Sequence, residues 1–335
     1  MILNRPGRGY PLSEFGISIP SSPNKAKRLL QVIREHEVLG PLEDKWLLGD
    51  DGVELTKEDI LRTHSPEYVE KLFSDRVDEV IIQVFELIDA NGNYHRYDPA
   101  KAKRPLSELF DRSLYGLAGT YQACRVAADT GFCFYLSGGG HHAHSDFGHG
   151  FCVLNDILIA LHKMQAEKLA NNIWIIDVDV HKGDGVAAIT KDDPSIVTLS
   201  AHMARGWPLD IPEFDDEGNQ HPSYTPSDID IPIESGEEPL YNEKLKEALD
   251  KLSTYPQPDL AFVQLGADPY EKDGLPSTAL MKLTLEQMNR RNEIIYRFIE
   301  ERKIPAVYIM SGGYGEHAWE PYPDFVIRAL LDRLV

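Results

Sequence analysis

The sequence predicts an α/β fold in which a central parallel sheet carries helices on both faces. Short apolar stretches alternate along the chain with longer segments of helical periodicity, and each apolar stretch is almost entirely hydrophobic. A strand of that composition is buried on both faces, as in a parallel sheet between two helix layers. The strands are expected at residues 132–136, 173–178, 196–199, 260–265 and 306–310.

Several helices are predicted from the residues that start them. Thr56 is followed three residues later by Asp59, which is the spacing of a capping box, and Ser65 precedes a proline. Thr284 has Gln287 at the same spacing as the first pair. Other helices are expected at 22–35, 77–88, 107–128 and 239–252, after residue 155, after residue 185 and at the carboxyl end, with loops at 97–105 and 201–235.

The composition limits the classes of function. The chain has 335 residues, and its net charge of −20 argues against direct nucleic-acid binding, since phosphate contacts need basic surfaces. No apolar run reaches the roughly 18 residues of a membrane helix, so no membrane association is expected. Cys124, Cys133 and Cys152 lack the spacing of a disulfide framework or a cysteine zinc site, and the cytoplasm is the expected location. Without an internal repeat or linker, residues 1–335 are predicted to form one domain.

A cluster of acids and one histidine follows the strand predicted at 173–178. Side chains alternate between the faces of a strand, so Asp177, Asp179 and His181 are expected to share one face. Burying these groups on an apolar strand is costly unless a positive charge lies between them. A solvated loop would explain an isolated Asp-x-Asp, but the added histidine and the following Gly-Asp-Gly turn favour a metal site.

Unusual polar residues follow three other predicted strands as well. His141 and His142 come after the first strand, Asp268 after a later one, and Tyr314 after the last. In an open parallel sheet, ligands bind at the carboxyl ends of the strands. The sequence therefore predicts that these side chains meet the acidic cluster at one edge of the sheet.

The residue types at this edge indicate metal-assisted hydrolysis of an amide or ester. Two carboxylates and one imidazole leave a coordination position open, as in catalytic zinc sites, where the ion lowers the pKa of water. Histidines on a glycine-rich loop supply a general base, and a tyrosine on a Gly-Gly turn can donate to an oxyanion. The other histidines are interpreted as surface or core side chains: His64, His144, His149, His162, His202 and His317.

The chain resembles the zinc-dependent histone deacetylase superfamily, which also contains acetylpolyamine amidohydrolases and acetoin-utilisation proteins. The resemblance covers residues 106–335 by motif. The segments that carry it are GGGHHA, GFCVLND, DVDVHKGDG, QLGADPY and SGGYG. It implies an arginase-like α/β fold, with helix layers around a central, mainly parallel sheet of about eight strands. The last of these motifs begins with Ser-Gly-Gly-Tyr, which is closer to short class IV-like and bacterial members than to class I enzymes.

The resemblance implies two kinds of cation site. Asp179, His181 and Asp268 would bind the catalytic zinc ion, with ferrous iron as the alternative metal. A structural potassium ion would lie at the strand ends near Asp177, Asp179, His181 and Ser200.

The resemblance also implies the roles of the catalytic residues. His142 is expected to be the general base and then acid, with Asp184 as its carboxylate partner. His141 is similar to the family's electrostatic histidine and is expected to pair with Asp177. Tyr314 corresponds to the tyrosine that polarises the scissile carbonyl.

The expected substrate tunnel combines one glycine and two aromatic residues. Gly150 and Phe151 resemble one wall, and Trp207 falls near the opposite wall. Lys182 departs from the histidine or glutamine of many members, and strand alternation predicts that it points away from the metal. The aspartate expected at the tunnel rim of class I enzymes has no clear counterpart near residues 97–104, so the resemblance implies hydrolysis but not peptide recognition.

The sequence therefore predicts a zinc-dependent deacylase acting on an acyl-amide such as N-acetyl-lysine on a protein or peptide, or a longer acyl-lysine. An amidohydrolase acting on an acetylpolyamine or another acylated small amine is the alternative within the family. A manganese ureohydrolase of the same fold would need further bridging carboxylates, and a silent binding protein would usually lack the tyrosine, the base or a metal ligand. The oligomeric state stays open.

Overall fold

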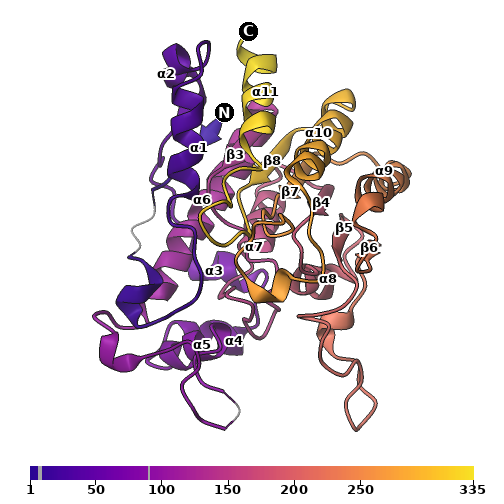
Figure 1. The fold of residues 1–335 in the computed structure, drawn as a ribbon. Coiled ribbons are helices and arrows are strands. Elements are labelled where there is room, and N and C mark those ends of the chain that lie inside the picture. The colour runs from indigo at the N-terminus through magenta and orange to yellow at the C-terminus, as the bar shows by residue number, and fades with distance from the viewer. Residues whose placement is uncertain (7–9, 90) are drawn as a thin grey trace.

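The computed structural model describes residues 1–6, 10–89 and 91–335 (Figure 1). One eight-stranded sheet forms its centre, in the order β2-β1-β3-β8-β7-β4-β5-β6, and all paired strands run parallel. The strands are β1 (Ile2–Leu3), β2 (Leu47–Leu48), β3 (Phe132–Tyr135), β4 (Ile173–Asp177), β5 (Ile196–Met203), β6 (Ile229–Ile233), β7 (Leu260–Gln264) and β8 (Ala306–Ile309).

Eleven α-helices are assigned within the described residues. They are α1 (Lys25–Arg34), α2 (Glu43–Trp46), α3 (Lys57–Leu61), α4 (Pro66–Leu72), α5 (Val77–Val84), α6 (Glu108–Thr130), α7 (Asp156–Ala166), α8 (Asp184–Thr190), α9 (Tyr241–Leu252), α10 (Leu285–Glu301) and α11 (Pro323–Leu334). None of these helices has the length and apolarity that crossing a membrane requires.

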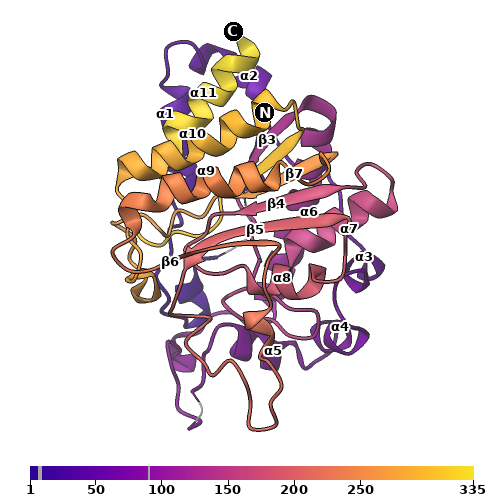
Figure 2. The same ribbon diagram turned by 90° about the vertical axis from the view of Figure 1, so that its right-hand side faces the viewer.

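The sheet lies between two helix layers, as Figure 2 shows. Phe132 and Phe134 of β3 belong to the apolar core that contains residues of α1, α9, α10 and α11, whereas Cys133 and Tyr135 belong to the core that contains residues of α6 and α7. This alternation buries both faces of every central strand, which is why those strands read as continuous apolar runs. The three-layer α/β fold and the central parallel sheet are confirmed.

The predicted helix starts are present. Thr56 and Asp59 form a capping box at α3, and Ser65 accepts a hydrogen bond from a backbone N–H at the start of α4. Thr284 and Gln287 form the capping box of α10.

Two expectations about element boundaries were wrong. The helix expected at 77–88 ends at Val84, since Glu86 has φ +52°, which an α-helix does not allow, and Ile88 pairs with Tyr94 in a short antiparallel bridge. The segment 201–235, expected to be a loop, contains the end of β5 and all of β6. β6 is an edge strand with the sequence Ile-Asp-Ile-Pro-Ile, and the half-buried Asp230 and the exposed Pro232 made it resemble the polar segment around it.

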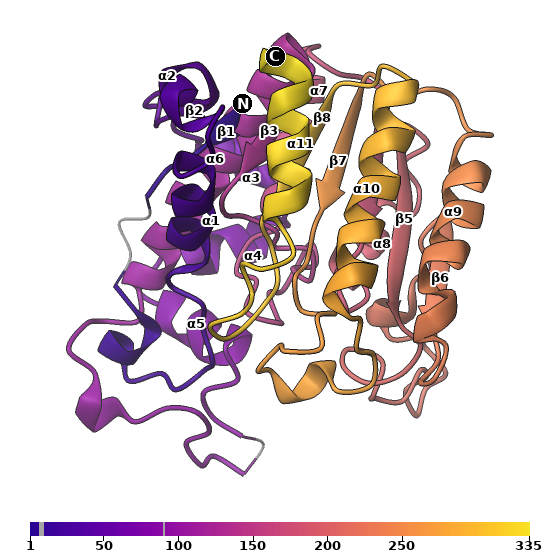
Figure 3. The same cartoon turned by 45° about the horizontal axis from the view of Figure 1, so that its top comes forward.

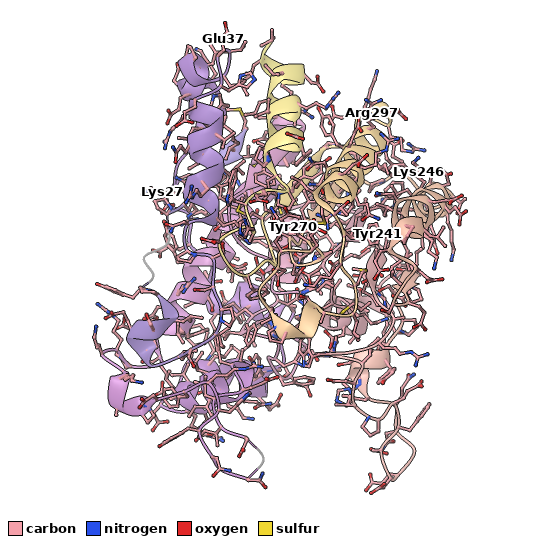
Figure 4. All side chains as sticks on the ribbon, in the orientation of Figure 1. Lys27, Glu37, Tyr241, Lys246, Tyr270 and Arg297 are labelled. Carbon is pink, nitrogen blue, oxygen red and sulfur yellow. The ribbon has the colours of Figure 1, made fainter. Side chains whose placement is uncertain are left out.

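The carboxyl ends of β3, β4, β7 and β8 are neighbours in the sheet. Figure 3 shows the loops that follow β7 and β8 gathered beyond the arrowhead of β7. In Figure 4, Tyr270 marks the loop after β7 near the middle of the molecule, and its hydroxyl donates to Glu320 Oε2 at 2.6 Å. This bond ties the loop after β7 to the segment that follows β8.

Candidate functional site

Three side chains of metal-ligand type meet at the carboxyl edge of the sheet. Asp179 and His181 follow β4, and Asp268 follows β7, the neighbouring strand. His181 Nδ1 lies 3.3 Å from Asp179 Oδ1 and 3.5 Å from Asp268 Oδ2. One ligand atom from each residue lies within 4.8 Å of the others, and all three residues are buried. The structure thus brings together the residues predicted to bind metal.

The electrostatics of this group fit a cation. Burial and the charge of Asp179 raise the pKa of Asp268. Burial opposes protonation of His181, but hydrogen bonds to Asp179 and Asp268 outweigh it and raise the pKa of His181 to about 9. A proton on the His181 imidazole therefore offsets part of the negative charge of the two adjacent buried carboxylates. A divalent ion would balance the same negative charge in place of that proton.

Glycines leave the space that such an ion and its ligands need. A Cβ atom at Gly312 would lie 2.4 Å from Asp179 Oδ2 and 2.7 Å from Asp268 Oδ2. A Cβ atom at Gly266 would lie 2.5 Å from Asp179 Oδ2. Any larger residue at either position would displace the carboxylates. The two carboxylates and one imidazole form a donor set suited to zinc or ferrous iron.

The two adjacent histidines have separate carboxylate partners. His141 Nδ1 lies 2.6 Å from Asp177 Oδ2, and His142 Nδ1 lies 2.8 Å from Asp184 Oδ1. Burial opposes protonation of His141, but Asp177 and Asp179 raise its pKa to about 10. Burial and the charge of His141 hold the pKa of His142 well below its ordinary value. His142 is therefore neutral, and the bond from Nδ1–H to Asp184 leaves Nε2 able to accept a proton.

A cavity of about 370 Å³ opens in front of this group. Its lining residues are Glu86, Arg96, His142, Gly150, Phe151, His181, Trp207, Asp210, Leu275, Pro276, Ser277 and Tyr314. All three predicted tunnel residues therefore face it, together with the candidate base and one candidate metal ligand. Asp177, Asp179 and Asp184 are buried behind that surface.

The walls of the cavity depend on close contacts. A Cβ atom at Gly150, where φ is +58°, would lie 2.3 Å from the Trp207 ring and 2.7 Å from the His142 ring. Phe151 has φ +66°, an uncommon conformation for a bulky residue, and stacks on Phe85 with ring centroids 5.8 Å apart. Trp207 meets His142 edge-on with ring centroids 4.4 Å apart. These rings and the bare glycine shape a channel that leads to His142.

Tyr314 is held by the loop that follows β7. Its backbone N–H donates to Asp273 Oδ2 at 2.6 Å, and its carbonyl accepts from Gly274 N–H at 2.9 Å. Burial and the charge of Asp268 raise the pKa of the Tyr314 phenol well above its ordinary value. The phenol is therefore a proton donor at neutral pH, facing the same cavity as His142.

Two other sequence expectations concern the surroundings of the site. Lys182 Nζ pairs with Asp230 Oδ2 of β6 at 3.0 Å and does not line the cavity. Ser200 Oγ lies 3.1 Å from His202 Nδ1 and 3.4 Å from the backbone N of Gly183. The structural potassium ion near Ser200 stays a prediction.

Sequence reasoning missed some supporting residues because they come from distant parts of the chain. Asp273 fixes the backbone of Tyr314 from another loop. Lys25, at the start of α1, donates from Nζ to the carbonyls of Ser311 and Gly312 at 2.6 Å each. Arg291 of α10 is fully buried and donates to the Val178 carbonyl at 2.9 Å. Only the last of these had a visible signal, an arginine on the apolar face of a predicted helix.

The surroundings of Asp184 also differ from what the sequence predicted. His144 Nε2 and His149 Nε2 lie 3.1 Å and 2.9 Å from Asp184 Oδ2, and Ser223 Oγ donates to the same oxygen at 2.5 Å. Both histidines had been interpreted as surface or core side chains. Their position in the loop of His142 was a signal that could have linked them to the site.

The comparisons with known proteins agree with one another. An uncharacterized protein of Picosynechococcus sp. is 31% identical over 210 residues, which are 62% of this chain and 65% of that protein. Histone deacetylase 2 of Arabidopsis thaliana is 28% identical over 277 residues, 82% of this chain and 65% of that protein. A probable deacetylase of Archaeoglobus fulgidus is 25% identical over 321 residues, 93% of this chain and 82% of that protein. The chain thus spans less than two thirds of the length of the first two relatives. The histone deacetylase domain matches residues 19–330, nearly the whole chain, and the chain therefore belongs to the histone deacetylase family.

Proposed function

We propose that this chain is a metal-dependent deacylase that hydrolyses an acyl-amide such as N-acetyl-lysine, or a longer acyl-lysine, to the free amine and a carboxylate. The observation that carries the proposal is that the Asp179, His181 and Asp268 group lies at the cavity that His142 and Tyr314 line. Zinc is the expected ion, with ferrous iron as the alternative, and in such a site it acts as a Lewis acid and lowers the pKa of water.

The chain's own residues supply the proton transfers and the orientation of the substrate. His142 Nε2 takes a proton from the attacking water, and Asp184 keeps the imidazole in the tautomer that allows this. The Tyr314 hydroxyl donates to the oxygen of the scissile carbonyl as negative charge develops on it. The protonated His142 then gives its proton to the leaving amine.

The charged His141 favours this sequence of steps. Its positive charge is fixed by Asp177 and Asp179 and lies beside the reacting group. It therefore stabilises negative charge as that charge develops, and it keeps His142 unprotonated before the reaction. A side chain at Gly150 would collide with the rings of Trp207 and His142, and this close approach at the channel would suit a slender stem such as a lysine side chain.

The charges at the cavity favour a second substrate class as a candidate. Glu86 and Arg96 form an ion pair at 3.2 Å, and Asp210 adds a further carboxylate to the lining. This acidic excess would suit an acylated small amine, such as an acetylpolyamine, whose free amino groups are cationic. A peptide substrate would be expected to present basic residues beside the acyl-lysine.

A substrate panel with metal analysis of the same sample tests the proposal. Peptides with acetyl-lysine and with longer acyl-lysines, and an N-acetylpolyamine, are each incubated with protein carrying one equivalent of zinc or ferrous iron. Hydrolysis of at least one amide, lost on removal of the metal and regained on its return, is the expected result. Metal-loaded protein that hydrolyses none of them would leave a binding protein as the better explanation.

A further inference from the structure

Tyr314 lies in a segment whose backbone is not held by a helix or a strand. Residues 311–314 follow β8 without regular secondary structure, and Tyr314 lies between Gly313 and Gly315, whose φ angles are +101° and +97°. Glycine adopts such angles without steric cost, and its backbone has the greatest conformational freedom. The place of the Tyr314 hydroxyl must therefore be fixed by contacts from elsewhere in the chain.

Two consecutive residues of the loop after β7 bind the backbone of Tyr314. Asp273 Oδ2 accepts from the Tyr314 N–H at 2.6 Å, and the N–H of Gly274 donates to the Tyr314 carbonyl at 2.9 Å. Asp273 Oδ1 accepts from the N–H of Leu275 at 2.8 Å. Tyr314 and Leu275 both line the cavity, so one carboxylate fixes the backbone at two places in its wall.

The other charged anchor of this segment cannot replace that carboxylate. Lys25 Nζ donates to the carbonyls of Ser311 and Gly312 at 2.6 Å each. Gly313, with φ +101°, separates these carbonyls from Tyr314. Rotation about the Gly313 backbone can therefore move the phenol while both lysine bonds stay intact.

The Asp273 carboxylate is ionised at neutral pH. Burial and the charge of Asp268 raise its pKa to about 6, although hydrogen bonds from the N–H groups of Leu275 and Tyr314 oppose the rise. Both oxygens therefore accept near pH 7. Hydrogen bonds to an ionised acceptor are shorter and stronger than neutral ones, which fits the 2.6 Å between Asp273 Oδ2 and the Tyr314 nitrogen.

We propose that Asp273 is a positioning residue of this site, which holds the Tyr314 hydroxyl where the oxyanion forms and affects hydrolysis through that hydroxyl. This role rests on the proposed function of Tyr314, whereas the anchoring of the Tyr314 backbone does not. Removing the carboxylate should lower kcat by about tenfold to a hundredfold, since a misplacement of about 1 Å can cost about 10². The loss should not exceed the roughly 10²–10³ expected when the donor itself is removed.

A double-mutant cycle separates this role from a merely structural one. We would measure kcat, KM and metal content for the metal-loaded wild type, Asp273→Ala, Tyr314→Phe and the double variant. Asp273→Ala should lower kcat in the wild-type background but change it by less than about twofold in the Tyr314→Phe background, which has no hydroxyl to position. Metal content should be the same in all four proteins. An equal fall of kcat in both backgrounds, or a loss of metal, would overturn the proposal.

Asp259→Ala is the matched control. Asp259 Oδ2 accepts from the backbone N–H groups of Asn171 and Asn172 at 2.8 Å and 2.9 Å, so it also fixes a loop. It precedes β7 and therefore lies at the amino edge of the parallel sheet, opposite the cavity. The control should lose thermal stability and keep its kcat. If Asp273→Ala does not fold, Asp273→Asn, which retains one acceptor oxygen, replaces it in the same cycle with the same criterion.

Amide hydrogen exchange tests the anchor without any substrate. The Tyr314 amide should exchange faster in Asp273→Ala than in the wild type, and Asp259→Ala should leave its exchange unchanged. Unchanged exchange at Tyr314 in Asp273→Ala would refute the anchoring. Faster exchange there, with no hydrolysis by any of the metal-loaded proteins, would refute the deacylase proposal and leave the anchoring of Tyr314 standing.

Discussion

Replacing Tyr314 with phenylalanine removes one hydroxyl from the cavity and leaves its backbone anchors intact. The contacts with Asp273 and Gly274 are made by the main chain of Tyr314, so the variant retains both. The ring also keeps its position 6.4 Å, centroid to centroid, from the ring of Phe151. The change therefore isolates the proton that the phenol donates.

The expected loss follows from the role of a single oxyanion donor. Burial and the charges of Asp268 and Asp179 raise the pKa of the Tyr314 phenol, so the proton is present at neutral pH. Removing one such donor from a water-poor site costs about 10²–10³ in kcat, or roughly 2.7–4 kcal/mol of transition-state stabilisation. KM should change little, because the bond strengthens mainly as negative charge develops.

The assay compares kcat, KM and metal content for the wild type, Tyr314→Phe and a matched control. Tyr270→Phe is that control, since Tyr270 lies on the loop after β7, which holds the backbone of Tyr314, and its hydroxyl donates to Glu320 at 2.6 Å but does not line the cavity. The control should lose some thermal stability and keep its kcat. Fully metal-loaded Tyr314→Phe that turns over at the wild-type rate would refute the assignment of Tyr314 as the oxyanion donor.

Other predictions concern the metal group. Asp268→Ala should remove the metal from the Asp179 and His181 group and abolish activity, and metal analysis that finds the ion still bound there would contradict the ligand assignment. Gly312→Ala should also weaken metal binding there, because its Cβ would crowd both carboxylates, whereas Gly274→Ala, with its nearest neighbour at 3.4 Å, is the control. The metal affinity should rise about tenfold per pH unit up to about pH 9, since the ion must displace the proton that His181 holds below its raised pKa. Calorimetry in buffers of different ionisation enthalpy measures that proton directly, and an affinity independent of pH between 7 and 8 would contradict the argument.

The parts of the fold that the sequence predicted are those whose signals are local. The central strands are apolar on both faces, and the starts of α3, α4 and α10 carry side chains that cap them. β1 and β2 have two residues each and are too short to show periodicity. β6 alternates buried isoleucines with Asp230 and Pro232, but a proline within a strand and the Pro- and Asp-rich segment around it made these residues resemble a loop.

The residues of the candidate site likewise fall into those with a local sequence signal and those without one. His142, Asp179, Asp268 and Tyr314 could be selected together because each follows a strand, and the carboxyl ends of parallel strands share an edge. Asp273 had no such signal, because its contact with Tyr314 depends on how two loops fold against each other. Loop conformation is set by tertiary contacts that a local pattern does not encode.

The distinct roles of the adjacent histidines arise from their carboxylate partners. Their ring centroids are 3.9 Å apart, and two unit charges at about 4 Å repel by roughly 4 kcal/mol at an effective dielectric constant of about 20. A proton on one ring therefore disfavours a proton on the other. His141 meets a carboxylate at each ring nitrogen, Asp177 at 2.6 Å and Asp179 at 3.8 Å, whereas His142 meets only Asp184, whose charge is shared among further donors. The proton is therefore bound by His141. His142, whose protonated form is less stabilised by carboxylates, stays neutral and can act as the base.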